Sequence, residues 1–342
     1  MEQIIFTTDS SMVLAELLRG VRHEQLFIVA DKHTVGFCDK LLEKVDWIPL
    51  NVAVVDCGEE NKSLNSVARI WSVLSKRGAR RSSILLCVGG GMVTDMGGFA
   101  ASTFKRGMRC IYVPTTLLAQ VDASLGGKTG INFDGLKNEI GTFKEPERVI
   151  IDVMFLKTLP VRERMAGFAE MLKHGLLSDV EYLDRLLTCD TDEPDREEFD
   201  LLKRSIAVKN EIVILDPLEK GVRKALNFGH TIGHAIESCS VMRHENLLHG
   251  ESVALGMIAE LYLSVREKGF PEEIFHRVRD FIRRYYPIYP VMGYADTLCE
   301  LMSHDKKNDR EGLNFTLLES VGQFSVDNYC SRELVMEALR QI

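Results

Sequence analysis

Four of the nine histidines of this chain lie close together in its second half, at His230, His234, His244 and His249. His230 and His234 are four residues apart in a run whose apolar spacing predicts a helix, so their side chains share one face. Neutral imidazole is a common zinc ligand and the usual proton carrier near neutral pH. The segment therefore predicts a metal site, a proton-transfer site or both. The alternative is a helix with scattered surface histidines.

The segment GFAEMLKHG offers an oxygen ligand for such a site. Glu170 and Lys173 are three residues apart and share a helical face, so an ordinary intrahelical ion pair is the alternative. Glu170 lies among apolar residues, where an unpaired carboxylate is costly. A catalytic zinc takes three protein ligands and keeps one open position. Asn227 and Gly229, just before His230, suit a helix start that approaches a ligand closely.

A glycine-rich turn in the first half, VGGGMVTDMGGFAAS, follows a predicted strand and opens a predicted helix. Gly90 and Gly91 would let backbone N–H groups approach a pyrophosphate, and Asp95 would meet a ribose or ring substituent. The alternative is a plain strand-to-helix turn, because the spacing is not GxGxxG. Asp31 ends an earlier strand, where an acid that binds ribose hydroxyls is expected, although a turn acid explains it equally well.

Two further segments carry cations. The segment from Pro114 to Phe143 is rich in glycine and hydroxyl residues, is expected to be a loop and is typical of anion binding. Its candidate residues are Asp122, Lys128, Lys137 and Asn138. Upstream of the histidines lie Lys209 and Arg223, and arginine offers a bidentate fork for carboxylate or phosphate. Lys220 and Lys224 fit better as charges on a solvated helix.

The surrounding elements divide the chain into two halves. Short β-branched runs predict strands at 26–31, 52–57, 84–91 and 110–114, and apolar residues at helical spacing predict a helix over 65–79. Buried strands alternating with helices indicate a parallel sheet covered on both faces. From about residue 159 the apolar spacing is helical, apart from a hairpin expected around Gly322. We expect domains at 1–158 and 159–342.

Composition excludes several classes of protein. The formal net charge of -8 argues against general nucleic-acid binding, and no apolar run is long enough to cross a membrane. The N-terminus lacks the pattern of a signal peptide. The eight cysteines are dispersed without a CxxC pair, which is typical of reduced thiols. We therefore expect a cytoplasmic protein with a small-molecule substrate.

Taken together, the motifs resemble the family of the 3-dehydroquinate synthases, within the sugar phosphate cyclases. The resemblance runs from GEENK at Gly58 to DKK at Asp305. The matching blocks are GGGMVTDMGGFAAS, FKRG, PTTLLAQVDASLGGKTGIN, KNEIGTF, TLPVRERMAGFAEMLKHG, GVRKALNFGHTIGHAIE and LHGESVALGM.

The resemblance implies a dehydroquinate synthase-like fold. An α/β, Rossmann-like N-terminal domain would bind NAD+, and an all-α C-terminal domain would bind metal and substrate. The metal would be divalent, Zn2+ before Co2+, and the assembly a homodimer. Glu170, His230 and His249 match the metal ligands, while His234 matches a proton-handling residue. His249 is preferred to His244 because it lies in the HGE motif.

Further residues match by motif position. The NAD+ positions are Asp31, Glu59, Lys62, Gly90, Gly91, Asp95, Thr115, Thr116, Asp122, Lys137 and Thr158. The substrate positions are Arg106, Lys128, Asn138, Lys173, Lys209, Arg223, Asn227, His234 and Lys306. His234, Lys209, Lys128 and Lys173 are the catalytic set that the resemblance implies, and Arg106 would reach the neighbouring subunit's site.

The implied reaction converts 3-deoxy-D-arabino-heptulosonate 7-phosphate to 3-dehydroquinate and phosphate, in the shikimate pathway of aromatic amino acid and chorismate biosynthesis. It proceeds by transient oxidation by NAD+, β-elimination of phosphate, reduction and intramolecular aldol closure. The alternatives are another sugar phosphate cyclase, whose substrate lacks the carboxylate, and a metal-dependent polyol dehydrogenase. A non-catalytic metal- and nucleotide-binding protein would not need this set of acids, bases and ligands.

Overall fold

A computed structural model describes residues 3–45, 47, 49–134, 136–189, 196–303 and 312–342. The chain divides into two compact units, Met1–Leu159 and Pro160–Ile342, and each unit is described by itself. The division falls one residue after the domain boundary expected from the sequence. Among the described residues, no helix is both long and apolar enough to cross a membrane.

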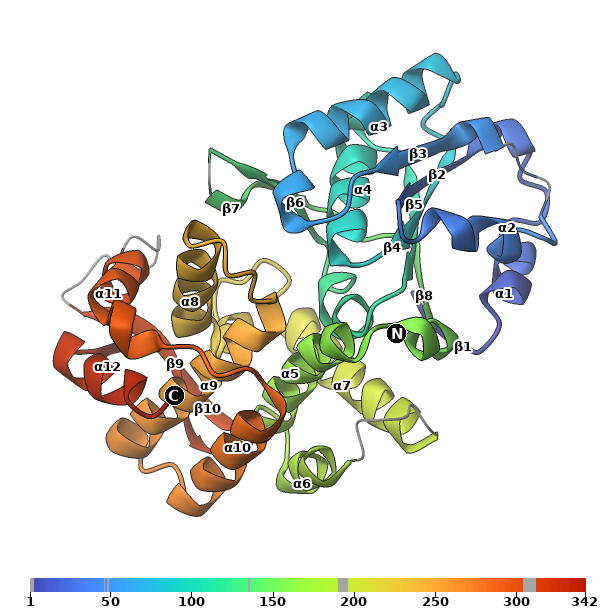
Figure 1. Cartoon of the computed structure of the whole chain (residues 1–342). Helices are drawn as coiled ribbons and strands as arrows, with labels where there is room; N and C mark the ends of the chain where they lie inside the picture. The colour runs from blue at the N-terminus through green and yellow to red at the C-terminus, as the bar shows by residue number, and fades with distance from the viewer. Residues whose placement is uncertain (1–2, 46, 48, 135, 190–195, 304–311) are drawn as a thin grey trace. The chain divides into compact units, whose positions relative to one another are not determined.

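The first unit is built on a six-stranded, wholly parallel sheet in the order β1-β8-β5-β4-β2-β3 (Figure 1). Its strands are β1 (Ile4–Thr7), β2 (Leu26–Asp31), β3 (Val52–Val55), β4 (Ile84–Gly89), β5 (Arg109–Pro114) and β8 (Arg148–Asp152). The four predicted strands are present within a few residues, and β1 and β8 were not predicted. The parallel α/β sheet confirms the expected class of this unit.

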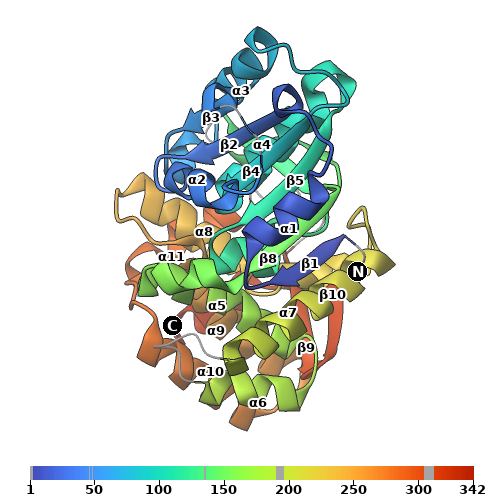
Figure 2. The same cartoon turned by 90° about the vertical axis from the view of Figure 1, so that its right-hand side faces the viewer.

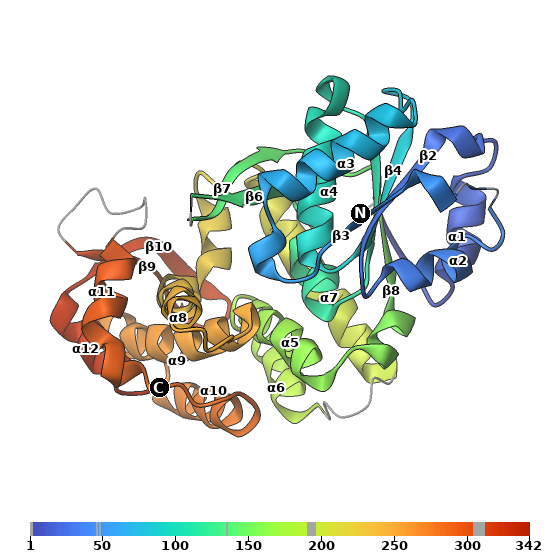
Figure 3. The same ribbon diagram turned by 45° about the horizontal axis from the view of Figure 1, so that its top comes forward.

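Helices cover both faces of this sheet, as Figure 3 shows. They are α1 (Ser10–Leu17), α2 (Cys38–Leu41), α3 (Leu64–Lys76) and α4 (Gly91–Thr103). Alternate strand residues, such as Ile28 and Leu86, join the core that also contains Leu14 of α1. The residues that alternate with these along each strand face α4 instead. For example, a Cβ on Gly97 of α4 would lie 2.3 Å from the Cys87 Sγ. Because successive side chains of a strand point to opposite faces of the sheet, each face contributes to its own core.

The segment expected as an anion-binding loop is partly a β-hairpin, which corrects that prediction. β6 (Lys128–Phe133) pairs antiparallel with β7 (Leu136–Phe143). Gly130 is paired with Gly141 across the two strands, and a Cβ on Gly141 would come within 2.2 Å of the Thr129 carbonyl oxygen. The glycines that suggested a loop therefore allow two backbones to approach closely.

The second unit is mainly helical, as predicted, and also contains the expected hairpin (Figure 2). Its helices are α5 (Val161–Leu176), α6 (Val180–Thr188), α7 (Arg196–Leu215), α8 (His230–Met242), α9 (His249–Lys268), α10 (Glu272–Tyr285), α11 (Ala295–Ser303) and α12 (Arg332–Leu339). The hairpin pairs β9 (Leu313–Ser320) with β10 (Gln323–Cys330), and Gly322 turns between them with a φ of 78°. The unit is therefore helical rather than strictly all-α.

Helix α9 lies at the centre of this unit and packs on α5, α8, α10, α12 and β9. Close approach to two of these helices depends on glycines. A Cβ on Gly250 would lie 1.8 Å from the Ala166 carbonyl oxygen of α5. A Cβ on Gly256 would lie 2.1 Å from the Gly229 carbonyl oxygen before α8. These two contacts bring the chain segments that carry Glu170, His230 and His249 within side-chain reach of one another.

Candidate active site

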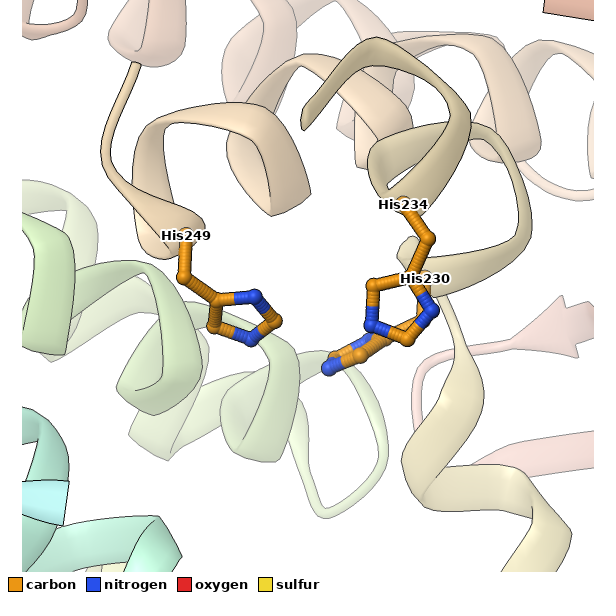
Figure 4. A group of neighbouring side chains, drawn as sticks. All are labelled: His230, His234 and His249. Carbon is orange, nitrogen blue, oxygen red and sulfur yellow. The ribbon is translucent and has the colours of Figure 1, made fainter. Parts of the chain in front are cut away.

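Three histidines and one glutamate of the second unit converge. His230 and His234 lie on the first turns of α8, and His249 is the first residue of α9. Their rings point toward one another, with centroids 5.2 to 5.6 Å apart (Figure 4). The Glu170 Oε1 of α5 lies 3.5 Å from the His230 Nε2 and 3.6 Å from the His249 Nε2. The structure thus brings these four predicted residues together, and their roles remain predictions.

The hydrogen bonds of two rings decide which nitrogen is available for a ligand. The His230 Nδ1 lies 3.1 Å from the Phe228 carbonyl oxygen, which can only accept. The His249 Nδ1 lies 3.3 Å from the Glu237 carboxylate, which also accepts. Both Nδ1 atoms therefore carry the proton, and in the neutral rings both Nε2 lone pairs point toward Glu170. This is the arrangement by which outer partners orient metal-binding histidines.

The charges of the site favour a cation. Burial alone would raise the pKa of Glu170, but Lys173, His230 and His249 outweigh it and hold that pKa well below its usual value. Burial, with the Lys173 charge, holds the pKa of His230 well below its usual value, so this ring is neutral. Burial would also lower the pKa of His249, but Glu237 and Glu170 raise it to about 10. A metal cation would replace the proton of His249.

A divalent metal fits these residues. Zinc bonds of about 2.0–2.2 Å in tetrahedral geometry place ligand atoms about 3.4 Å apart, close to the two separations at Glu170. The Glu170 carboxylate is fully buried, and among the described residues its oxygens have charged neighbours rather than well-oriented hydrogen-bond donors. His230, His234 and His249 also bring ligand atoms within 4.8 Å of one another, so a set of three histidines is geometrically possible as well.

The remaining histidine of the segment lies apart from this group. His244 is exposed in the turn after α8, with a φ of 59°, and does not belong to the group of three. His234 is also exposed, unlike His230, although its ring lies beside both others. An exposed imidazole next to a buried metal site is well placed to exchange protons with solvent.

The predicted cations of this unit are mostly buried. Lys173 is 1% exposed and forms an ion pair with Glu170, so the intrahelical pair exists but is enclosed. Lys209 and Arg223 are also buried, and an Arg223 guanidinium nitrogen donates to the Pro217 carbonyl oxygen at 2.7 Å. Because burying a cation is costly, these buried cations point to function more strongly than an exposed lysine does. Lys224, which we expected to be solvated, is about one-third exposed and pairs with Asp327.

Asn227 and Arg223 belong to one short segment. Both lie on the 3-10 helix Val222–Asn227, which ends just before α8. The Asn227 Nδ2 donates to the Glu219 carboxylate at 3.0 Å. Gly229 caps α8 with a φ of 79°, a conformation that glycine adopts without strain. The predicted helix start before His230 is thereby confirmed.

In the first unit, the predicted nucleotide residues gather at the carboxyl edge of the sheet. Asp31 ends β2 and accepts hydrogen bonds at 2.9 Å from the backbone of His33 and Thr34, which is the turn role considered for it. The Thr34 hydroxyl in turn donates to the Val88 carbonyl oxygen near the end of β4. Because carboxyl ends of parallel strands meet at one edge, this edge is the usual ligand site of such sheets.

The glycine-rich turn packs closely on the end of β5. Gly90 caps α4 and Gly91 begins it. A Cβ on Gly90 would lie 3.2 Å from a methyl carbon of Thr116, and the Thr115 N–H donates to Gly89 at 3.0 Å. The turn therefore requires small residues and leaves backbone N–H groups at the helix start, which suits an anion. Asp122 follows on a short π-helical turn, Ala119–Ala123.

A second group of predicted residues surrounds Lys62. Its ammonium lies 2.5 Å from the Asp95 Oδ2 and 2.5 Å from the Asn138 Oδ1. Glu59 accepts a hydrogen bond at 2.9 Å from the Asn132 Nδ2. Burial raises the pKa of Asp95, although the Lys62 charge opposes the rise. Residues predicted for nucleotide and for substrate are thus in direct contact within this unit.

Several other predicted residues are exposed. Lys128 and Lys137 are exposed on the β6–β7 hairpin, and Thr158 is exposed at the end of the 3-10 helix Val153–Thr158. Arg106 is exposed beside a surface pocket of about 400 Å³ that Arg81, Arg109 and Lys144 also line. Lys306 lies outside the described residues.

Two buried acids of the site were not predicted. Glu237 follows His234 by three residues on α8, so the helical spacing could have indicated that it shares the face of the histidines. Glu260 interrupts the apolar run of α9, and its carboxylate accepts from the backbone of Gly229 at 2.6 Å and of Ile232 at 3.1 Å. It therefore caps the start of α8 from a neighbouring helix and fixes His230 in place.

A parallel α/β unit with a glycine-rich turn, and a helical unit with a Glu–His centre, are suited to an enzyme that uses a nucleotide and a divalent metal. The family model described as 3-dehydroquinate synthase N-terminal matches residues 52–166, and that described as 3-dehydroquinate synthase C-terminal matches residues 167–308. The chain belongs to the 3-dehydroquinate synthase family, whose members are phosphate-eliminating lyases.

Known proteins are similar to this chain in sequence or in fold. The 3-dehydroquinate synthase of Parabacteroides distasonis is 46% identical over 342 residues, covering 99% of this chain and 97% of that protein. A solved 2-deoxy-scyllo-inosose synthase, complexed with carbaglucose-6-phosphate, NAD+ and Co2+, has a TM-score of 0.84 at 24% identity, covering 99% and 96% of the two chains. The 2-epi-5-epi-valiolone synthase of Streptomyces hygroscopicus, with NAD+ and Zn2+ bound, has a TM-score of 0.85 at 24% identity, covering 98% and 95%.

Proposed function

We propose that this chain converts 3-deoxy-D-arabino-heptulosonate 7-phosphate to 3-dehydroquinate and phosphate. Membership of the family supports this reaction. The observation that carries the proposal is the convergence of the His230 and His249 Nε2 atoms on one oxygen of the buried Glu170, with both Nδ1 protons already engaged. The eight free cysteines support a cytoplasmic location.

The proposed cofactors are NAD+, held by the first unit, and a divalent metal, held by Glu170, His230 and His249 of the second. Solved proteins of this fold contain NAD+ with Co2+ or Zn2+. When bound, these groups supply a reversible hydride acceptor and a positive charge that lowers the pKa of a substrate hydroxyl. The residues proposed to hold NAD+ are Asp31, Glu59, Lys62, Gly90, Gly91, Asp95, Thr115, Thr116, Asp122, Lys137 and Thr158.

The substrate carries a carboxylate and a phosphate, and the cations of the chain suit both. Lys128 and Arg223 are proposed to bind the carboxylate, where arginine can bind two oxygens at once. The phosphate would be bound by Lys173, Asn138, Asn227, Lys306 and Arg106. Asn138 and Asn227 add neutral amide donors, which bind an anion without the desolvation cost of a further charge.

Protons are proposed to be moved by His234 and Lys209. His234 is exposed beside the two proposed ligand rings, and a ligating nitrogen cannot also carry a proton, so His234 is the histidine left for this task. Lys209 is buried in the same unit, and a lysine side chain is one of the groups that can transfer a proton. Both groups would act at the substrate hydroxyl that is oxidised and at the hydroxyl beside it.

The reaction is tested by measuring phosphate release from 3-deoxy-D-arabino-heptulosonate 7-phosphate, with and without a chelator, while following NADH absorbance. We expect release that depends on metal and is not accompanied by NADH accumulation, because the redox steps cancel. A polyol dehydrogenase would accumulate NADH with glycerol instead. Absence of phosphate release from metal-loaded, NAD-loaded protein would overturn the proposal and point to another sugar phosphate.

We further propose a homodimer in which Arg106 serves the neighbouring subunit's site. Arg106 and Lys105 both adopt left-handed backbone conformations, with φ of 64° and 49°. Non-glycine residues rarely adopt these angles, and such strain concentrates at functional sites. An exposed arginine on a strained turn is well suited to contact a partner molecule.

Mixing two inactive variants tests this sharing. We expect Arg106→Ala and Lys128→Ala each to lose most activity, and the mixture to regain up to about one quarter of it after subunit exchange. Half of the dimers would then be mixed, and one of their two sites would be intact. Activity is measured by phosphate release, with each variant alone as the control. A mixture no more active than its components would show that Arg106 acts within its own subunit.

A further inference from the structure

The buried ammonium of Lys62 contacts both a proposed nucleotide residue and a proposed substrate residue. The side chain is only 5% exposed, and its Nζ lies 2.5 Å from the Asp95 Oδ2 and 2.5 Å from the Asn138 Oδ1. A buried cation is costly unless it is paired and hydrogen-bonded. The Asp95 carboxylate supplies the charge, and the Asn138 amide oxygen supplies a second acceptor.

The contact fixes the direction of the Asn138 amide. A side-chain amide has an acceptor end and a donor end, and the assignment of its oxygen and nitrogen usually depends on its neighbours. An ammonium group has donors only, so the amide oxygen must face Lys62. The Nδ2 group, which carries two donors, is therefore turned away from Lys62 on an exposed residue.

The backbone of Asn138 is held as firmly as its side chain. Asn138 has a φ of 51°, and its N–H donates to the Asn132 Oδ1 at 2.9 Å. The Asn132 N–H donates to the Lys62 carbonyl oxygen at 2.8 Å, and its Nδ2 donates to Glu59. Asn132 thus ties the hairpin to the segment that carries Glu59 and Lys62. The donor end of Asn138 is presented in one orientation.

We propose that Lys62 is a positioning residue for substrate binding, in addition to any contact with the nucleotide. By holding the Asn138 oxygen, it directs the Nδ2 donors toward the anionic group of the substrate. Lys128 and Lys137 lie on the same hairpin, so the ligand that this surface suits is anionic. The inference rests on the proposed function, in which Asn138 binds the substrate phosphate.

A double-mutant cycle with Lys62→Met and Asn138→Ala tests the inference at saturating NAD+. We expect each single variant to raise the KM for the heptulosonate phosphate about tenfold or more, as for loss of a hydrogen bond to a charged group. The double variant should be no worse in KM than the worse single one, because Lys62 acts through Asn138. The NAD+ dissociation constant, measured by titration, should change with Lys62→Met equally in both backgrounds.

Effects on KM that multiply in the double variant would overturn the inference, since Lys62 would then act independently of Asn138. Lys62→Arg keeps the charge beside Asp95, so it should restore NAD+ affinity. It should restore the KM for the heptulosonate phosphate less fully, because the longer guanidinium side chain displaces the Asn138 amide. If Lys62→Met fails to fold, Asn138→Asp provides the test with Lys62 intact. The carboxylate should raise KM more than Asn138→Ala does, and an equal or smaller rise would also overturn the inference.

Failure of the inference is distinguishable from failure of the proposed function. Wild-type protein that releases phosphate from the heptulosonate phosphate, combined with multiplying KM effects, would reject only the positioning role of Lys62. Wild-type protein that releases no phosphate would reject the proposed function and the inference together.

Discussion

We expect Glu170→Gln to lose the divalent metal and nearly all activity. Glutamine fills the same space but carries no charge to hold a cation, and it leaves the buried Lys173 ammonium without its carboxylate. Removing one partner of a buried charge pair costs about 3–5 kcal/mol, and the same loss between carboxylate and metal would lower metal affinity on the order of 10²–10⁴-fold. Metal content by mass spectrometry after dialysis, together with phosphate release, measures the effect.

Graded control variants separate loss of a ligand from general damage. Glu237 is not a proposed ligand but holds the His249 ring, so Glu237→Gln should weaken metal binding about 10- to 100-fold. Glu333 is exposed on α12, and Glu333→Gln should leave metal and activity unchanged. NAD+ affinity should persist in all three variants, because the proposed nucleotide residues belong to the first unit. Stoichiometric metal in Glu170→Gln would show that the three histidines hold the ion.

The parallel sheet was predictable because its central strands are continuous apolar runs. β2 and β4 are buried at every position, which is the pattern of strands covered on both faces. β1 has only four residues and none is fully buried, so its sequence carries little signal. The β6–β7 hairpin was mistaken for a loop because its glycines Gly130 and Gly141 allow two paired strands to approach closely and do not form a turn. Composition alone does not distinguish these two uses of glycine.

The site was predictable where its residues share one helix. His230 and His234 were placed on one face by their spacing, but the pairing of His230 with His249 was implied only by the family resemblance. His249 begins a different helix, and its position depends on the close packing of glycines between helices. Contacts between distant residues, such as Lys62 and Asn138 at a separation of 76 positions, have no local signal at all.

The second large effect is expected for His234→Ala, which should keep both metal and NAD+ but lower kcat about 10²- to 10⁴-fold, the usual contribution of a positioned acid or base. His234 is exposed and its ring lies 5.2 and 5.6 Å from those of His230 and His249, so its removal leaves the Nδ1 bonds of both proposed ligands intact. The first hydride transfer should become slower. The isotope effect on kcat with substrate deuterated at the oxidised carbon should therefore rise.

His244→Ala is the matched control, since it removes another exposed histidine of the same segment that lies outside the cluster. It should leave kcat, metal content and NAD+ affinity unchanged. Because His234 is accessible to solvent, added imidazole should restore part of the activity of His234→Ala and none of that of Glu170→Gln. Loss of bound metal in His234→Ala would instead identify His234 as a ligand, and the proton would then have to be carried by another group such as Lys209.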